Sequence, residues 1–321
     1  MSTYIRRQEI AHPVGARGRL TLRVSDADVR VTGAPTGDAK VIATFEIVAS
    51  SDDEATRLFE ALQMHVGASG GELTVEQREQ GSGRNALSRL LSRTGSASLE
   101  IEATIPAGAE LRVETVSGDV NATNLVGEQR YTAVSGDVVI LDGAGSVRLN
   151  TVSGDAILRA SGALELRAET VSGDLGITAP RLDALRASTV SGDVDIEGAL
   201  RAGGEHRIET VSGDVMFAPV GGASFEVRGL STDITGDVDH RIEGRADRRH
   251  VVVGGGGPEA VFSSMSGDFH VRRPRRLEQH PEAAAGEAVG APEPANELEV
   301  LRALERGEID VEEAARRLGN R

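Results

Sequence analysis

Between about residues 98 and 273, short segments of alternating apolar and polar residues are separated by a recurring tripeptide. The tripeptide is Ser-Gly-Asp, and its copies begin at Ser117, Ser135, Ser153, Ser172, Ser191, Ser212 and Ser266. The steps between the first six copies are 18, 18, 19, 19 and 21 residues. Thr235-Gly236-Asp237 is a variant, and we expect it to fill the longer gap before the last copy. This regular spacing indicates an internal repeat.

Alignment of the copies on their Ser places apolar residues at fixed positions. They stand four residues before the Ser, one before it, three after it and five after it; around Ser153 these are Leu149, Val152, Ala156 and Leu158. Apolar residues that recur at period two on both flanks of a turn are typical of β-strands. We therefore expect these columns to face the interior, with Ser-Gly-Asp forming a corner whose polar side chains bond to the local backbone.

The repeat predicts an all-β fold, a β-solenoid or β-helix of about nine short coils between residues 98 and 273. One unit of this length cannot bury its own inward face, but stacked units bury a continuous aliphatic column. The alternative is an antiparallel meander or sandwich in which Ser-Gly-Asp is a hairpin turn. Recurrence of the same residue type at the same position favours the solenoid, because like residues then stack on like.

The pattern divides the chain into four segments. Residues 1–97 read as an α+β cap of strands and one helix, which begins near Asp52 and covers an otherwise open solenoid end. Residues 98–273 form the solenoid, and residues 274–295, rich in Pro, Ala and Glu, read as a flexible linker. Residues 296–321 predict a helical hairpin that serves either as an end-cap or as a protein-binding module, with the apolar residues Leu301, Leu304, Ile309 and Leu318.

Composition and charge exclude several classes of function. The chain has 321 residues and no Cys, which excludes disulfides, thiol nucleophiles and Cys-ligated metals. Its net charge of −15 disfavours a nucleic-acid partner. No apolar run is long enough to span a membrane, and the N-terminal residues lack the apolar core of a secretory signal, so we expect a cytoplasmic protein.

An arginine column is the first candidate site. One Arg stands five residues before each Ser, and by alternation this column faces outward: Arg112, Arg130, Arg148, Arg167, Arg186 and Arg207. Such a stripe could bind a polyanion or a carbohydrate. The other interpretation is an ion-paired surface, because Glu114, Glu169 and Glu209 lie two residues further on the same face.

The aspartates of the tripeptide form a second column. Stacked carboxylates could bind Ca²⁺, but calcium-binding repeats of this size carry more Gly and Asp per turn, so we expect a structural corner and no metal or other cofactor. No H-E-x-x-H motif occurs. We therefore expect no catalytic residue, although polysaccharide hydrolases and lyases also use β-helices.

The segment IPAGAELRVETVSGDV, at 105–120, and the TVSGD copies that follow resemble the bacterial "putative adhesin" β-strand-repeat family of unknown function. The C-terminal pattern of Leu301, Leu304, Gly307 and Ile309 resembles a helical-hairpin module often joined to such repeats. The resemblance implies a β-helical protein without established activity, with some members linked to envelope stress. We expect a non-enzymatic scaffold or adhesin-like protein that acts through protein–protein contacts, including those of a homo-oligomer. The alternative is a polyanion- or carbohydrate-binding module that uses the arginine column.

Overall fold

A computed structural model describes residues 2–77, 97–245 and 248–275. The chain divides into two units, Met1–Arg276 and Leu277–Arg321, and the described residues lie in the first. The predicted hairpin at 296–321, with Leu301, Leu304, Ile309 and Leu318, lies outside the described residues, as does most of the predicted linker.

The described residues are mostly β-strand. The N-terminal part contains β1 (Ser2–Pro13), β2 (Arg19–Asp26), β3 (Asp28–Ala34), β4 (Asp38–Ala49), α1 (Asp52–Leu62), β5 (Met64–Ser69), β6 (Glu72–Gln77) and β7 (Ala97–Pro106). The middle part contains β8 (Glu110–Ser117), β9 (Val120–Thr123), β10 (Gln129–Ser135), β11 (Val138–Ser153), β12 (Ala156–Ser172), β13 (Leu175–Ser191) and β14 (Val194–Leu200). The C-terminal part contains β15 (His206–Ser212), β16 (Val215–Pro219), β17 (Ala223–Ser231), β18 (Ile234–Gly236), β19 (His240–Arg245), β20 (Arg248–Val253), β21 (Glu259–Ser266) and β22 (Phe269–Val271).

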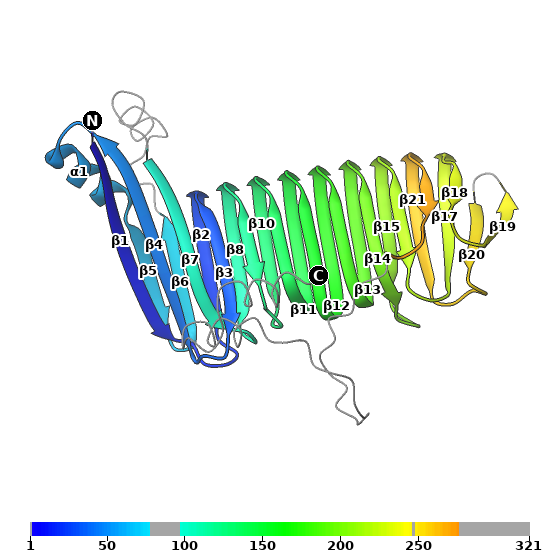
Figure 1. Cartoon of the computed structure of the whole chain (residues 1–321), viewed down its shortest axis with the longest axis horizontal. Helices are drawn as coiled ribbons and strands as arrows, with labels where there is room; N and C mark the ends of the chain where they lie inside the picture. The colour runs from blue at the N-terminus through cyan, green and yellow to red at the C-terminus, as the bar shows by residue number, and fades with distance from the viewer. Residues whose placement is uncertain (1, 78–96, 246–247, 276–321) are drawn as a thin grey trace, which may run out of the picture. The chain divides into compact units, whose positions relative to one another are not determined.

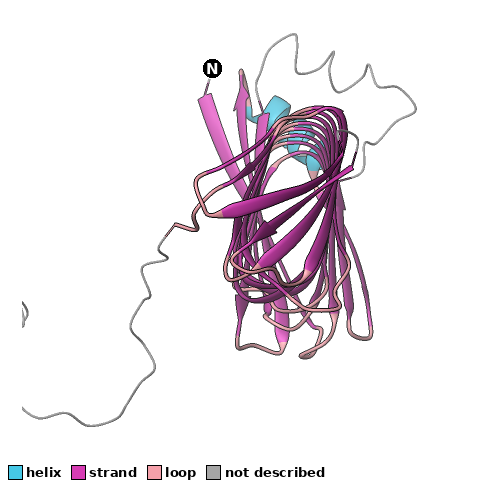
Figure 2. Cartoon of the chain, turned by 90° about the vertical axis from the view of Figure 1, so that its right-hand side faces the viewer, coloured by secondary structure: helices cyan, strands magenta, loops and turns pink. Residues whose placement is uncertain are grey.

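The strands form one continuous sheet that is folded into two faces. We call the strand before a corner together with the strand after it a rung. The strands before the corners form the first face, and the strands after the corners form the second face. The long strands β11, β12 and β13 pair with their neighbours along both halves, so each contributes to both faces. Successive rungs lie over one another (Figures 1 and 2).

Neighbouring repeats pair in parallel and in register. Tyr131 lies opposite Leu149, and Leu149 lies opposite Ala168, so each residue stacks on its equivalent in the next repeat. This is the pairing of a β-solenoid-like fold. It differs from a meander or sandwich with Ser-Gly-Asp hairpins, because each corner connects the two faces rather than two antiparallel neighbours.

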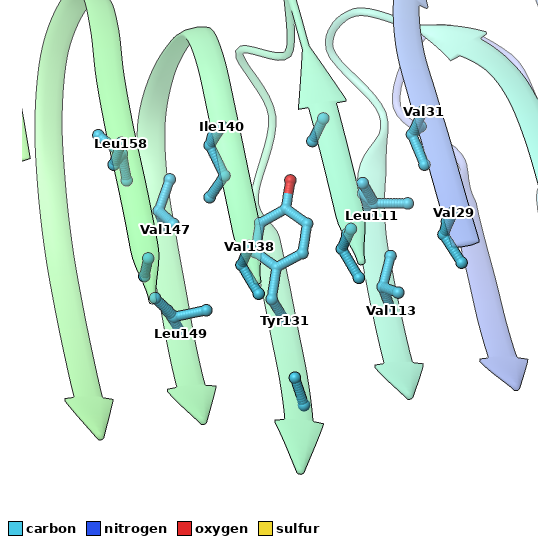
Figure 3. Packing of buried hydrophobic residues seen from close by; sticks show 14 of the residues in the cluster. Val29, Val31, Leu111, Val113, Tyr131, Val138, Ile140, Val147, Leu149 and Leu158 are labelled. Atoms are coloured by element: carbon cyan, nitrogen blue, oxygen red, sulfur yellow. The ribbon is translucent and has the colours of Figure 1, made fainter. Parts of the chain in front are cut away.

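The interior is built from the predicted aliphatic columns. Leu149, four residues before its Ser, is buried, and so are Val138 and Ile140, which follow a corner. Figure 3 shows side chains from both faces meeting around Tyr131. The Tyr131 hydroxyl donates to Gln129 Oε1 at 2.8 Å, and burial raises the pKa of this phenol.

One predicted column is not interior. The valines one residue before each Ser are 42–53 % exposed: Val116, Val134, Val152, Val171, Val190 and Val211. The expectation that this column is buried was wrong for a geometric reason. Side chains alternate along a strand, so positions one and four residues before the Ser point to opposite sides.

The C-terminal rungs are not stacked in sequence order. The β21–β22 rung lies between β15–β16 and β17–β18, because β21 pairs with both β15 and β17. The corner of the last rung is Ser231-Thr232-Asp233, since Ser231 lies opposite Ser266. The assignment of Thr235-Gly236-Asp237 to a corner was therefore wrong: Thr235 and Gly236 belong to β18, opposite His270 and Val271.

At the N-terminal end, the repeat register continues into residues assigned to the cap. β2 and β3 pair in parallel with β8 and β9, and on their other side with β6 and β7. The helix predicted after Asp52 is confirmed as α1, whose N-cap Ser51 accepts a hydrogen bond from the Glu54 backbone at 3.3 Å. Among the residues that the structure describes, α1 alone is helical, and it is too short and too polar to cross a bilayer.

Candidate functional site

The corners between the two faces are held by a column of glycines. Gly154 has a φ of +133°, a conformation that side chains disfavour. A Cβ added at Gly154 would lie 2.2 Å from the carbonyl oxygen of Gly136 in the preceding rung. The same contact recurs from Gly118 to Gly267, so successive corners approach each other closely. Glycine is thus required both by backbone conformation and by the spacing between rungs.

The aspartates of the corners form a hydrogen-bonded ladder. Oδ1 of Asp137 accepts from the backbone N–H of Asp155 at 2.9 Å, and Oδ1 of Asp155 accepts from that of Asp174 at 2.9 Å. The ladder joins the following aspartates in spatial order: Asp28, Asp119, Asp137, Asp155, Asp174, Asp193, Asp214, Asp268 and Asp233. These bonds join one rung to the next, and they offset the repulsion between stacked carboxylates.

The structure corrects one member of this column. Asp233 terminates the ladder, and Asp237, which the sequence pattern had placed there, instead lies 3.2 Å from Nε2 of His270. The other nitrogen of His270 lies 2.8 Å from the Thr235 hydroxyl. Within the described ranges, no group of three or more His, Cys, Asp or Glu residues is arranged to hold a metal ion.

The corner is hollowed in the C-terminal half of the stack. A shallow groove of about 540 Å³ runs along it, lined by Ser, Gly and Asp residues of successive corners, from Asp174 to Asp268. The exposed valine column lies immediately before these serines, on the outer side of the first face. Met265 continues the column at the β21 rung and is 58 % exposed. The first face therefore presents an apolar stripe beside an acidic edge.

The arginine column is in register, as predicted. Arg130 lies opposite both Arg112 and Arg148, and Arg167 opposite Arg186. Most of its members are ion-paired. Arg148 lies 2.9 Å from Glu128, Arg186 pairs with Glu205, and the column's other ion pairs are Arg112–Glu110, Arg167–Glu169 and Arg207–Glu209.

The three glutamates that follow these arginines by two residues are all ion-paired, two of them within their own strand. Glu169 and Glu209 pair with the arginines two residues before them, at 2.6 Å each. Glu114 instead pairs with Arg23 at 3.0 Å. Arg112 pairs with Glu110, and Arg19, 2.7 Å from the same carboxylate, lowers the pKa of Glu110.

Arg130 is the exception in the column. It has no carboxylate partner among the described residues, and its Nε is buried without a hydrogen bond. Thr132 occupies the position at which Glu169 and Glu209 pair with the arginines of their own strands. A negatively charged polymer could thus bind the Arg130 guanidinium directly, but it would have to displace a carboxylate from each of the other arginines of the column.

The register, the glycine corners and the aspartate ladder define a β-solenoid-like repeat protein. Residues 18–272 match the family model described as Toastrack DUF4097, and the chain belongs to this family. No curated protein matches the chain.

Several solved structures are similar to this chain. A "putative adhesin" from Bacteroides fragilis is 13 % identical, with 83 % of this chain and 97 % of that chain covered and a TM-score of 0.37. A "putative cell adhesion protein" from Clostridium sporogenes is 10 % identical, with 84 % and 100 % covered and a TM-score of 0.28. A "putative lipid binding protein" from Parabacteroides distasonis is 10 % identical, with 84 % and 97 % covered and a TM-score of 0.29. Scores this low carry no argument about function.

Proposed function

We propose that this protein is a non-enzymatic, adhesin-like scaffold that binds a protein partner along its first face. The observation that carries the proposal is the column of exposed valines, which runs in register from Val116 to Val211. Apolar side chains that are aligned and exposed on a rigid sheet present a surface whose burial by a partner is favourable.

The surroundings of the column support a protein partner over a polyanion. Ion pairs occupy most of the arginine column, and the aspartate ladder adds negative charge along the adjacent corner. A polyanion would be repelled by that edge. A protein with an apolar strip and basic flanking residues would complement both the valines and the aspartates.

The cellular role of the protein and a second partner-binding segment are further parts of this proposal. The resemblance to adhesin-like repeat proteins suggests a role linked to envelope stress. The C-terminal segment, with Leu301, Leu304, Ile309 and Leu318, is a second partner-binding candidate. Removing residues 274–321 tests whether the repeat domain binds the partner by itself.

Site-specific photo-crosslinking in the cells that make the protein would test the proposal. A photoreactive residue at position 152 should give a defined protein adduct, and Val134→Lys with Val171→Lys should abolish it. Ile157, 43 % exposed on the second face, is the matched control position and should give no such adduct. The same adduct from both positions, or an adduct that survives both substitutions, would contradict the proposal.

A further inference from the structure

A cavity lies at the N-terminal end of the fold, away from the corner and the arginine column. Its volume is about 250 Å³, and it is lined by Arg6, Arg7, Gln8, Phe45, Phe59 and Gln63. These residues come from β1, from β4 and from the C-terminal end of α1, which lie together in Figure 1. Phe45 and Phe59 are buried side chains that line the cavity, so part of its wall is aromatic and the rest is polar.

The walls of this cavity are fixed by hydrogen bonds between the elements. The Gln8 side chain donates to the Met64 carbonyl at 3.1 Å and accepts from the Met64 N–H at 3.0 Å. The Tyr4 hydroxyl donates to Asp52 at 2.7 Å, which joins β1 to the start of α1. Arg6 lies opposite Phe45 in the β1–β4 pairing. These bonds fix β1 against the start of α1 and against Met64, so a ligand would not have to order these elements on binding.

The cavity is lined by two arginines, which carry positive charge. The Arg6 guanidinium carbon lies 5.8 Å from the centre of the Phe59 ring. Neither Arg6 nor Arg7 has a carboxylate partner among the residues described. By contrast, Arg19 and Arg23 of β2 and Arg30 of β3 are each paired with glutamates. Positive charge beside an aromatic wall suits an anion that also carries an apolar group.

We propose that this cavity binds a small organic anion, a carboxylate on an aromatic or short branched apolar body. The apolar body packs against Phe45 and Phe59, and Arg6 binds the carboxylate. The Gln63 amide is available to orient the ligand. This site is separate from the first face, so its occupancy and the proposed protein binding can be tested independently.

Calorimetric titration of the full chain with 3-phenylpropionate tests this inference. We expect saturable binding with a Kd of about 0.1–1 mM, the range for a ligand of this size. Arg6→Gln should weaken binding at least about tenfold, since it removes the charge-assisted contact, and the neutral probe 3-phenylpropanol should bind similarly weakly to the unaltered protein. Arg17→Gln, at an arginine that does not line the cavity, should leave the affinity unchanged.

The thermal midpoint of each variant establishes that it is folded, and Arg6→Lys provides a second measurement. This substitution keeps the positive charge and should retain part of the affinity lost in Arg6→Gln. Lack of saturation with 3-phenylpropionate at millimolar concentrations would overturn the inference. Equal affinities for the unaltered protein and Arg6→Gln, or for the acid and the alcohol, would overturn it as well.

Discussion

The middle rungs of the stack and the C-terminal rungs stabilise the same architecture in different ways. From β10 to β14, rungs follow in sequence order, and each repeats the glycine corner of its neighbour and an interior whose apolar residues are aliphatic except at Tyr131. From β15 to β22, the order is broken and the interior is aromatic. The rings of Phe217 and Phe225 have centroids 4.9 Å apart, and Phe225 and Phe269 are 5.1 Å apart.

The two regions also differ in where their carboxylates lie and in what these carboxylates bond to. In the middle, carboxylates lie on the exposed corner and form the ladder. In the C-terminal region, Glu226 is buried and accepts hydrogen bonds from both Arg228 and Arg248. The middle depends on contacts that recur from rung to rung, whereas the C-terminal region adds the Glu226 cluster to the glycine corners and the ladder that it shares with the middle. This difference predicts how each region responds to substitution.

The largest effect is expected at a glycine corner of the middle region. Gly154→Ala places a Cβ against the Gly136 carbonyl and forces a residue with a side chain to a φ of +133°. We expect a loss of about 4 kcal/mol or more in the free energy of unfolding, measured by urea denaturation. Gly37→Ala, where an added Cβ meets nothing within 4 Å, is the control and should change little. Equal stabilities of the two variants would show that the corners are not close-packed.

The next effect is expected at Glu226 in the C-terminal region. The hydrogen bonds from Arg228 and Arg248 lower the pKa of Glu226 to about 2. Glu226→Gln should lower the free energy of unfolding by about 1–3 kcal/mol at neutral pH, because it leaves two guanidinium groups without their counter-ion.

This effect should depend on pH. Since the folded pKa of Glu226 lies below the unfolded value, the carboxylate contributes its full stabilisation above about pH 4.5 and loses it as the pH falls toward 2. The difference in thermal midpoint between the unaltered protein and Glu226→Gln should therefore shrink over that range. A difference that stays constant with pH would exclude this ion pair as its source.

A smaller effect is expected in the aspartate ladder. Asp155→Ala removes the acceptor of the Asp174 N–H and should cost about 1 kcal/mol. Asp155→Asn keeps an acceptor oxygen and reduces repulsion along the column, so its stability should stay within about 0.5 kcal/mol of the unaltered protein. Urea denaturation of both variants at low and at high salt separates the contribution of the hydrogen bond from that of the repulsion between carboxylates. If the alanine and asparagine variants were equally unstable, charge rather than the hydrogen bond would hold the ladder.

The smallest effect is expected in the exposed valine column, where the two regions should behave alike. Val171→Thr and Met265→Thr each alter a side chain that is about half exposed, so each should change the free energy of unfolding by less than about 0.5 kcal/mol. Ile177→Thr, buried in the same part of the stack, should cost several times more. A large loss at Val171 would mean that the column stabilises the fold and is not a free surface.

Much of the middle region could be predicted from the sequence, because a register repeated in space is also repeated along the chain. The interior positions of Leu149 and Ile140 and the outward arginine column followed from alternation. The exposure of Val152 was within reach of the same rule, since it lies three residues from Leu149. Valine is usually an interior residue, so the sequence pattern placed Val152 inside. Residues separated by an odd number of positions, however, point to opposite sides of a strand.

The stacking order of the C-terminal rungs could not be predicted from the sequence pattern. All rungs share the same pattern, so the pattern does not indicate which rung pairs with which. The separation of Ser212 and Ser266 was the only signal that the sequence offered. The N-terminal cavity was beyond prediction for a different reason. Arg6, Phe45 and Phe59 come from three elements whose packing has no repeat, so no spacing in the sequence connects them.

The late position of β21 and β22 in the chain affects how the molecule can be made. A nascent polypeptide can add rungs in order of synthesis as far as Pro219, but Thr210 finds its hydrogen-bond partner only when Ser264, 54 residues later, has been translated. Until then the growing edge at β15 and β16 stays open, and open strand edges template aggregation. The fold is therefore complete only when its last strands have been translated. Truncation of the chain before β21 would leave the edge of β15 and β16 unpaired.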